Sequence, residues 1–263
     1  MEWEKEAEKA VKQVPFFVRK KVKSRVEEEA QKEGKNRITL KEVEATRKRF
    51  LSNMDSEIKG YQLDACFGPG GCPNRTLESE RLTEKLEMVL KEADIAGFLR
   101  TQVKGPLKYH HEFRVTVSEC PNACSQPQIK DVGIIGARRP FVTENDCTFC
   151  EACTACCDES AIDLQDDGPV LLMDRCVMCG KCIDACPEKV IGEQEKGYRI
   201  QLGGKLGRHP MLARELGRLF SQAETVDMVR KCLQYYKEKS TGGKRFAEIL
   251  AENDDEFIRL LKG

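Results

Sequence analysis

The chain has 263 residues, and its 44 Lys and Arg balance its 44 Asp and Glu, so its formal net charge is zero. This balance gives no net attraction to nucleic acid or to an anionic membrane, and no apolar run approaches the roughly 18 residues of a spanning helix. The acidic, polar start Met1–Glu4 lacks the basic stretch and apolar run of a signal peptide, which predicts a cytoplasmic protein.

The first 59 residues are predicted to form three helices. An amphipathic stretch covers residues 3–14, and a second helix covers residues 16–32. Thr39 and Glu42 have the spacing of a capping box, which predicts the start of a third helix. Residues 1–59 are therefore predicted to be a small helical domain.

The sequence after residue 60 mixes helical and strand patterns. Apolar residues at helical spacing predict a helix from about Leu77 to Ala96, with Gly97 as its stop. Apolar residues in alternating or continuous runs predict strands at Phe113–Val117, Val132–Ile135 and Tyr198–Leu202. Further helices are predicted at Met211–Phe220, Val226–Tyr236 and Phe246–Leu261. This mixture predicts an α+β fold.

Fourteen cysteines are too many for chance in a chain that is expected to be cytoplasmic, and short fixed spacings there indicate metal ligands rather than disulfides. Twelve of them fall into four tight groups. Two groups share the pattern C-x-x-C-x-x-C-x-x-x-C, and their members are Cys147, Cys150, Cys153 and Cys157, and then Cys176, Cys179, Cys182 and Cys186. This segment of about 50 residues is an internal duplication.

The duplicated segment resembles the ferredoxins that hold two [4Fe–4S] clusters, in which the fourth Cys of each run binds the other cluster. The resemblance implies one cluster on Cys147, Cys150, Cys153 and Cys186, and a second on Cys176, Cys179, Cys182 and Cys157. The first run departs from the family because Asp158 stands where Pro is expected and Cys156 adjoins the expected ligand. Spacing favours Cys157 as the ligand. The alternative is structural zinc, which usually uses two C-x-x-C pairs.

The four outer cysteines lie in Cys66-Phe67-Gly68-Pro69-Gly70-Gly71-Cys72-Pro73-Asn74 and in Cys120-Pro121-Asn122-Ala123-Cys124. Together with Gly203-Gly204-Lys205-Leu206-Gly207-Arg208-His209-Pro210, these motifs resemble the sulfite and nitrite reductases that use siroheme. The resemblance implies a third [4Fe–4S] cluster on Cys66, Cys72, Cys120 and Cys124. The glycines near Cys66 are expected to let the backbone aim N–H groups at the cluster sulfurs. The alternative is four buried free cysteines.

This resemblance also implies a domain plan and an anion site. A reductase core over residues 60–139 and 193–263 would carry the ferredoxin module at 140–192, as in the dissimilatory branch of the family. Cys124 would also reach the siroheme iron. Cationic partners for siroheme or substrate are predicted among Arg75, Arg100, Lys104, Lys108 and Arg114, although a solvated surface role is the alternative for each. His110 and His111 are candidate proton donors, or ordinary surface or core histidines.

The helical N-terminus resembles the C-terminal domain of the B subunit of light-independent protochlorophyllide reductase. The resemblance rests on Glu6-Ala7-Glu8-Lys9, Val14-Pro15-Phe16-Phe17-Val18-Arg19 and Ile38-Thr39, and it covers about 45 residues. In that enzyme the domain helps to cover a tetrapyrrole substrate. A generic three-helix docking domain is the alternative.

Three functions follow from these patterns. The first is a reductase of the sulfite or nitrite type, which would pass electrons from the ferredoxin clusters to a siroheme-coupled cluster and reduce a small inorganic oxyanion. The second is a non-catalytic electron carrier in a larger complex, and the third is the handling of a tetrapyrrole. No nicotinamide or flavin site is evident, so an electron-donor redox protein is the expected partner, with a catalytic subunit or a second copy of the chain as further partners.

Overall fold

The computed structural model describes residues 1–14, 16–252, 257 and 261, with the backbone alone for residues 16–18 and 51–57. Contacts divide the chain into two compact units, one of residues 1–58 with 104–109, and one of residues 59–103 with the residues from 110 onward. No helix in the described part of the chain has the length and apolar character needed to cross a membrane.

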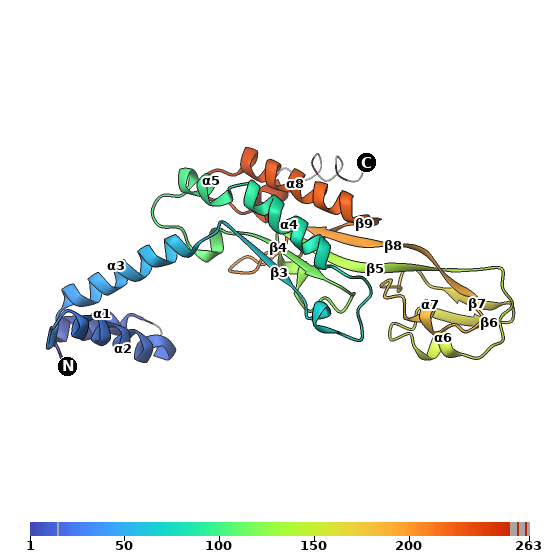
Figure 1. Ribbon diagram of the computed structural model, residues 1–263, viewed down its shortest axis with the longest axis horizontal. Coiled ribbons are helices and arrows are strands. Elements are labelled where there is room, and N and C mark those ends of the chain that lie inside the picture. Colours follow the sequence, from blue (N-terminus) through green and yellow to red (C-terminus); the bar gives the residue numbers. More distant parts are fainter. Residues whose placement is uncertain (15, 253–256, 258–260, 262–263) are drawn as a thin grey trace. The chain divides into compact units, whose positions relative to one another are not determined.

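The first unit contains the three helices that the sequence predicts, which are α1 (Lys5–Lys12), α2 (Phe16–Lys32) and α3 (Leu40–Glu57) (Figure 1). Two short strands, β1 (Glu2–Trp3) and β2 (Arg37–Ile38), pair in parallel beside them. A small core of Ala7, Val26, Ala30 and Ile38 is buried between these elements.

The predicted capping box at the start of α3 is confirmed. The Thr39 hydroxyl accepts a hydrogen bond from the Lys41 N–H at 3.2 Å, and the Glu42 carboxylate accepts one from the Thr39 N–H at 2.9 Å. We expect Thr39→Ala to destabilise α3 by about 1 kcal/mol, which corresponds to roughly fivefold faster amide hydrogen exchange along the helix. Thr101→Ala, at an exposed threonine of the other unit, is the control, and unchanged exchange in α3 would contradict the prediction.

The second unit is built on a five-stranded mixed sheet with the strand order β3-β4-β5-β8-β9. The strands are β3 (Tyr61–Ala65), β4 (Phe113–Ser118), β5 (Val132–Val142), β8 (Ile191–Leu202) and β9 (Arg214–Phe220). The first three are parallel to one another, whereas β8 and β9 are antiparallel to their neighbours. The chain therefore combines strands and helices in an α+β fold, as predicted.

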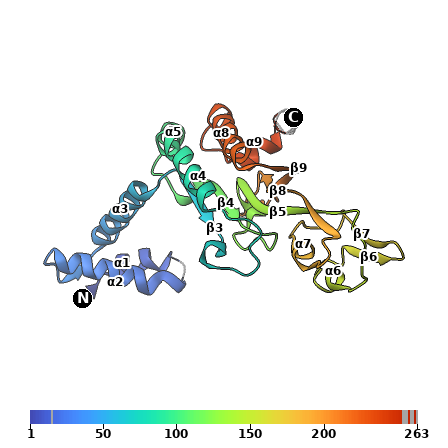
Figure 2. The same ribbon diagram turned by 45° about the vertical axis from the view of Figure 1, so that its right-hand side comes forward.

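Helices cover one side of this sheet. They are α4 (Glu80–Glu92), α5 (Ile95–Gln102), α8 (Gln222–Lys239) and α9 (Phe246–Glu252), and both views show α4 and α8 on the same side (Figure 2). The core beneath them is aromatic, since the ring of Phe113 lies 5.3 Å from the rings of both Tyr236 and Phe246. Cys232 of α8 is completely buried in this core and lies in none of the four cysteine groups.

Two predictions in this unit are wrong. The helix predicted at Met211–Phe220 is strand β9, because a bulge that contains Gly217 (φ 82°) interrupts the strand alternation. The bulge places Leu216, Leu219 and Phe220 at helix-like spacing although all three are buried on a strand. Gly97 does not stop a helix either. It lies in the first turn of α5, where its N–H donates to the capping carboxylate of Asp94 at 3.1 Å.

The other predicted elements of the second unit are present, although the helix predicted at Phe246–Leu261 is described only as far as α9 and at Phe257 and Leu261. Strands β5 and β8 extend beyond the sheet as a long antiparallel pair that leads into the cysteine-rich segment (Figure 1). That segment holds α6 (Ala152–Ala155), the hairpin of β6 (Ile162–Gln165) and β7 (Gly168–Leu171), and α7 (Lys181–Ala185).

Candidate metal centre

The duplication in the sequence is also a duplication of backbone conformation with a period of 29 residues. Helices α6 and α7 begin 29 positions apart. Left-handed residues recur at the same interval, as the pairs Phe149 and Met178, Glu151 and Gly180, and Ser160 and Lys189. Because β6 pairs with β7 while the end of β5 pairs with the start of β8, the two copies exchange strands symmetrically. This exchange brings the last cysteine of each run toward the other run.

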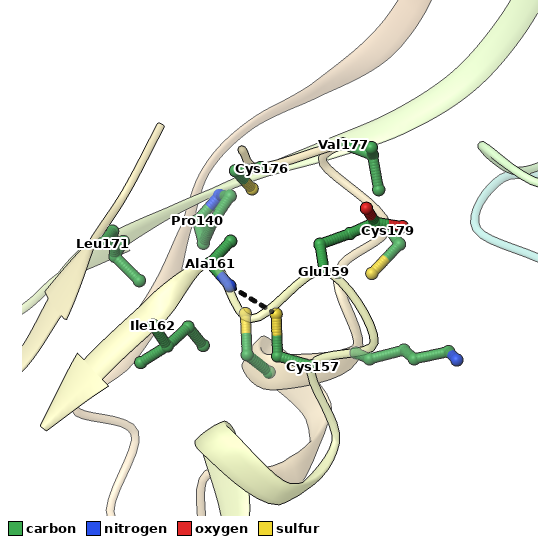
Figure 3. A pocket seen from close by; sticks show the side chains of 12 residues that line it. Pro140, Cys157, Glu159, Ala161, Ile162, Leu171, Cys176, Val177 and Cys179 are labelled. Carbon is green, nitrogen blue, oxygen red and sulfur yellow. Dashed lines mark hydrogen bonds between the residues drawn. The ribbon is translucent and has the colours of Figure 1, made fainter. Parts of the chain in front are cut away.

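One cavity, of about 380 Å³ including its opening, is lined by four thiols from both copies. They are Cys176, Cys179 and Cys182 of the second run and Cys157 of the first. In Figure 3, the side chains of Cys157, Cys176 and Cys179 surround this space, and the N–H of Ala161 donates to the sulfur of Cys157 at 3.3 Å.

A second cavity, of about 330 Å³ including its opening, is lined by the complementary set of thiols. These are Cys147, Cys150 and Cys153 of the first run and Cys186 of the second. The structure thus gathers the two crossed sets of four cysteines that the ferredoxin resemblance implies.

Cys156, the extra cysteine of the first run, lies in neither set. Its thiol donates a hydrogen bond to the carbonyl of Cys153 at 3.2 Å, and its position in the repeat corresponds to Ala185. Cys157 corresponds to Cys186 and faces a cavity. The geometry therefore assigns the ligand position to Cys157.

The thiol environments fit an iron–sulfur cluster. Backbone N–H groups donate to the first sulfur of each run, from Phe149 to Cys147 and from Met178 to Cys176, both at 3.4 Å. Burial raises the pKa of Cys182 to about 12, and neighbouring thiols raise it further. Four gathered thiolates therefore cost free energy unless a cationic group binds them.

The arrangement does not fit the zinc alternative. Four sulfurs around one zinc ion, each about 2.3 Å from the metal, must lie about 4 Å from one another. Throughout the described residues, no three His, Cys, Asp or Glu side chains are grouped closely enough for one metal ion. The thiols instead surround cavities, as a larger cluster requires.

The four outer cysteines lie beyond the carboxyl ends of two neighbouring parallel strands. Cys66 follows β3 directly, and Cys120 follows β4 by two residues. Burial raises the pKa of the Cys120 thiol, and the thiols of Cys66, Cys72 and Cys124 raise it further because they lie nearby. The Cys66 sulfur accepts N–H bonds from Gly68 at 3.4 Å and Glu119 at 3.3 Å. The expected aiming of backbone N–H groups at this sulfur is therefore present.

Glu119 is a buried carboxylate that holds the two outer cysteine loops together, with a side chain only 1% exposed. One of its oxygens accepts from the N–H and hydroxyl of Ser79 at 2.8 and 2.7 Å. The other lies 2.9 Å from Arg75 Nε, as an ion pair rather than a well-aligned hydrogen bond. A Cβ on Gly68 would lie 1.9 Å from this oxygen, so only glycine fits there.

Cys124 differs from the other outer cysteines because it is exposed, whereas Cys120 is buried and Cys66 and Cys72 are half-buried. Ala123, directly before it, has a left-handed backbone (φ 53°). One thiol of the outer group is thus open to a further cofactor or partner.

Core residues bind three consecutive carbonyl groups of the second cysteine run. Arg199 of β8 donates to the Val177 carbonyl at 3.2 Å, and the backbone N–H of Arg138 donates to the Met178 carbonyl at 2.8 Å. The Thr76 hydroxyl donates to the Cys179 carbonyl at 3.2 Å, and the Thr76 N–H donates to the Glu119 carbonyl at 3.0 Å. Through Thr76, the loop of Cys179 is therefore hydrogen-bonded to the residue before Cys120.

Comparison with protein families places this arrangement. The model described as nitrite and sulphite reductase 4Fe-4S domain matches residues 61–261. The chain belongs to this family. Residues 3–47 match the family described as proto-chlorophyllide reductase 57 kD subunit, in line with the resemblance of the N-terminal helices.

Individual relatives agree with membership of the nitrite and sulphite reductase family. The chain is 37% identical over 172 residues to coenzyme F420-dependent sulfite reductase of Methanocaldococcus jannaschii, which covers 65% of this chain and 25% of that protein. It is 26% identical over 121 residues to the C subunit of anaerobic sulfite reductase of Salmonella typhimurium, which covers 46% of this chain and 30% of that protein. The chain thus spans less than a third of each.

A solved structure shows the same fold. The crystal structure of dissimilatory sulfite reductase I aligns with a TM-score of 0.51 and 13% identity, over 76% of this chain and 51% of that one.

The basic residues that the family resemblance nominated do not gather around the outer cysteines. Arg75 lies there, but it is paired with Glu119 and with Glu80 at 2.5 Å. Arg114 lies near the start of β4, six residues and roughly 20 Å of strand from Cys120. Arg100 is exposed at the end of α5, before the connection to that same strand end. Their role as anion partners stays a prediction that this geometry does not favour.

Lys104 and Lys108 have exposed side chains and belong to the first compact unit. His110 and His111 lie in the short turn η2 (Tyr109–His111) before β4, with their rings 4.2 Å apart. The start of β4 is the end of the strand opposite to Cys120, so neither histidine is adjacent to the outer cysteines along the sheet.

Sequence reasoning missed Glu119 and Thr76. Glu119 directly precedes Cys120, and a lone acidic residue beside a cysteine carries no pattern. Thr76 is 103 residues from the carbonyl that it binds. The only signal available was the position of both residues beside cysteine motifs.

Proposed function

We propose that this chain holds three [4Fe–4S] clusters and is the electron-transferring part of a siroheme-dependent sulfite or nitrite reductase. The crossed sets of thiols around two cavities, beside a third group of four cysteines, carry this proposal. When bound, the clusters supply one-electron carriers that feed a siroheme-coupled cluster for reduction of a small oxyanion. Residues 140–192 would form the ferredoxin module, residues 60–139 and 193–263 the reductase core, and residues 1–59 the helical domain.

The residues of the chain have distinct roles in this proposal. Cys66, Cys72, Cys120 and Cys124 would hold the core cluster, with exposed Cys124 as the thiolate that also reaches siroheme. Backbone N–H groups from Gly68 and Glu119 stabilise negative charge on the Cys66 sulfur. A reducing, cytoplasmic compartment belongs to the proposal, because twelve ligand thiols must stay free of disulfides.

A second candidate is a non-catalytic subunit that wires an electron donor to a separate catalytic chain. The short coverage of both curated relatives favours it, because the rest of each relative has no counterpart here. In this case siroheme would be completed by a partner subunit or by a second copy of the chain.

Anaerobic purification followed by iron, sulfide and tetrapyrrole quantitation tests the proposal. We expect about twelve iron and twelve sulfide per chain, and siroheme absorption bands when siroheme is added. Cluster reduction without siroheme binding or sulfite turnover, together with co-purification of another redox subunit, would select the second candidate. Colourless protein, or protein that contains zinc instead of iron, would refute both.

A further inference from the structure

The two copies of the cysteine run have the same conformation but opposite surroundings. In the second copy, the core binds the carbonyl groups of Val177, Met178 and Cys179. The corresponding residues of the first copy, 29 positions earlier, are Thr148, Phe149 and Cys150. All three are exposed, and none of their carbonyl oxygens accepts a hydrogen bond from any described residue. The first loop is therefore an unused copy of a surface that the core already shows how to bind.

The side chains of the first loop suit a protein partner. The ring of Phe149 is 48% exposed beside the exposed Cys150, which lines the second cavity. An apolar group of this size at the centre of a polar rim is typical of a protein-binding surface. The equivalent Met178 is half-buried where its loop meets the core.

The rim of the first loop is acidic. Glu151 and Glu188 line the second cavity and are exposed, as is Asp146 one residue before Cys147. Within the described chain, none of these three carboxylates forms an ion pair. The 53 residues from 140 to 192 contain eleven Asp and Glu but three Lys and Arg, although the whole chain is neutral.

The core shows which chemistry binds such a loop. The groups that hold Val177, Met178 and Cys179 are the guanidinium of Arg199, the backbone N–H of Arg138 and the hydroxyl of Thr76. Arg138 and Arg199 both carry positive charge beside this loop and are paired with carboxylates. A partner of the first loop must likewise offer hydrogen-bond donors and positive charge.

We propose that the Thr148–Cys150 loop, with Phe149 at its centre and Glu151 and Glu188 at its rim, is the docking surface for a redox protein with a basic, donor-rich face. This inference rests on the proposed function, because it assumes that the neighbouring thiols hold a cluster. It orders the chain, with the Cys147 site as the outer electron port and the Cys176 site as the inner one, bound to the core through Thr76.

The test uses a basic c-type cytochrome as the probe of this surface. The full chain is reduced under anaerobic conditions and mixed with ferric cytochrome in a stopped-flow instrument. Each reaction moves one electron from the reduced protein to one ferric haem, which becomes ferrous. We expect Glu151→Lys with Glu188→Lys to slow the second-order rate about tenfold or more at low ionic strength and to flatten its salt dependence.

The matched control is Glu84→Lys with Glu92→Lys on α4, which changes the net charge equally at exposed positions. We expect its rate to stay within about twofold of that of the unmodified chain. Phe149→Ala is the third variant, and it should slow the reaction while leaving the salt dependence intact.

Iron content, measured on every variant, separates the two levels of the argument. Equal rates for both double variants, at full iron content, would overturn the docking surface and leave the proposed function standing. Absence of iron from the unmodified chain would overturn both. Loss of iron from the Glu151 and Glu188 variant alone would refute the assignment of these carboxylates to the rim, and the Phe149→Ala rate would then decide the docking surface.

Discussion

Replacement of Cys157 by Ser is expected to remove one complete cluster, about four of roughly twelve iron atoms per chain. Cys157 faces the cavity of the second run and accepts the N–H of Ala161, so its loss leaves three thiols around that cavity. Iron and sulfide quantitation after anaerobic purification, with low-temperature electron paramagnetic resonance of the reduced protein, measures the loss.

Cys156→Ser is the matched control, because it makes the same change one residue earlier. Its thiol donates to a carbonyl, a bond that a serine hydroxyl can also make, so full iron content is expected. Iron loss from the Cys156 variant, with retention in the Cys157 variant, would reverse the assignment of the ligand.

Glu119→Ala is expected to lower the stability of the second unit by about 3 kcal/mol, because it removes a buried carboxylate and leaves the Ser79 donors without their acceptor. For a unit of this size, such a loss lowers the melting temperature by roughly 6–12 °C. Circular dichroism under anaerobic conditions measures the melting midpoint. Because Glu119 also joins the two outer cysteine loops, we expect the core cluster to be lost at lower temperature than in the unmodified chain.

Glu80→Ala is the comparison for Glu119, since Glu80 is the other partner of Arg75 but lies on the surface. Surface ion pairs contribute little to stability, so its melting temperature should be nearly unchanged. Equal shifts for both variants would show that the Arg75 pairing, rather than the buried position of Glu119, stabilises the loops.

The sequence by itself determined which residues are available as ligands and much of the secondary structure. The four cysteine groups are visible because ligand spacing is local, and the capping box at Thr39 is visible because both partners lie within four residues. Strand β9 was not predictable, because the bulge at Gly217 depends on pairing with β8 and produces helix-like spacing.

The tertiary structure alone decided how the cysteine groups are connected. The exchange of strands between the two copies sets Cys157 rather than Cys156 at a cavity, and the sequence left that choice open. Likewise, nothing local distinguishes the loop of Phe149 from that of Met178. Only contacts with Thr76, Arg138 and Arg199, up to 103 residues away along the chain, make one loop inner and the other outer. Contacts between residues so distant in sequence leave no periodic pattern, so folding has to bring them together before their roles can be seen.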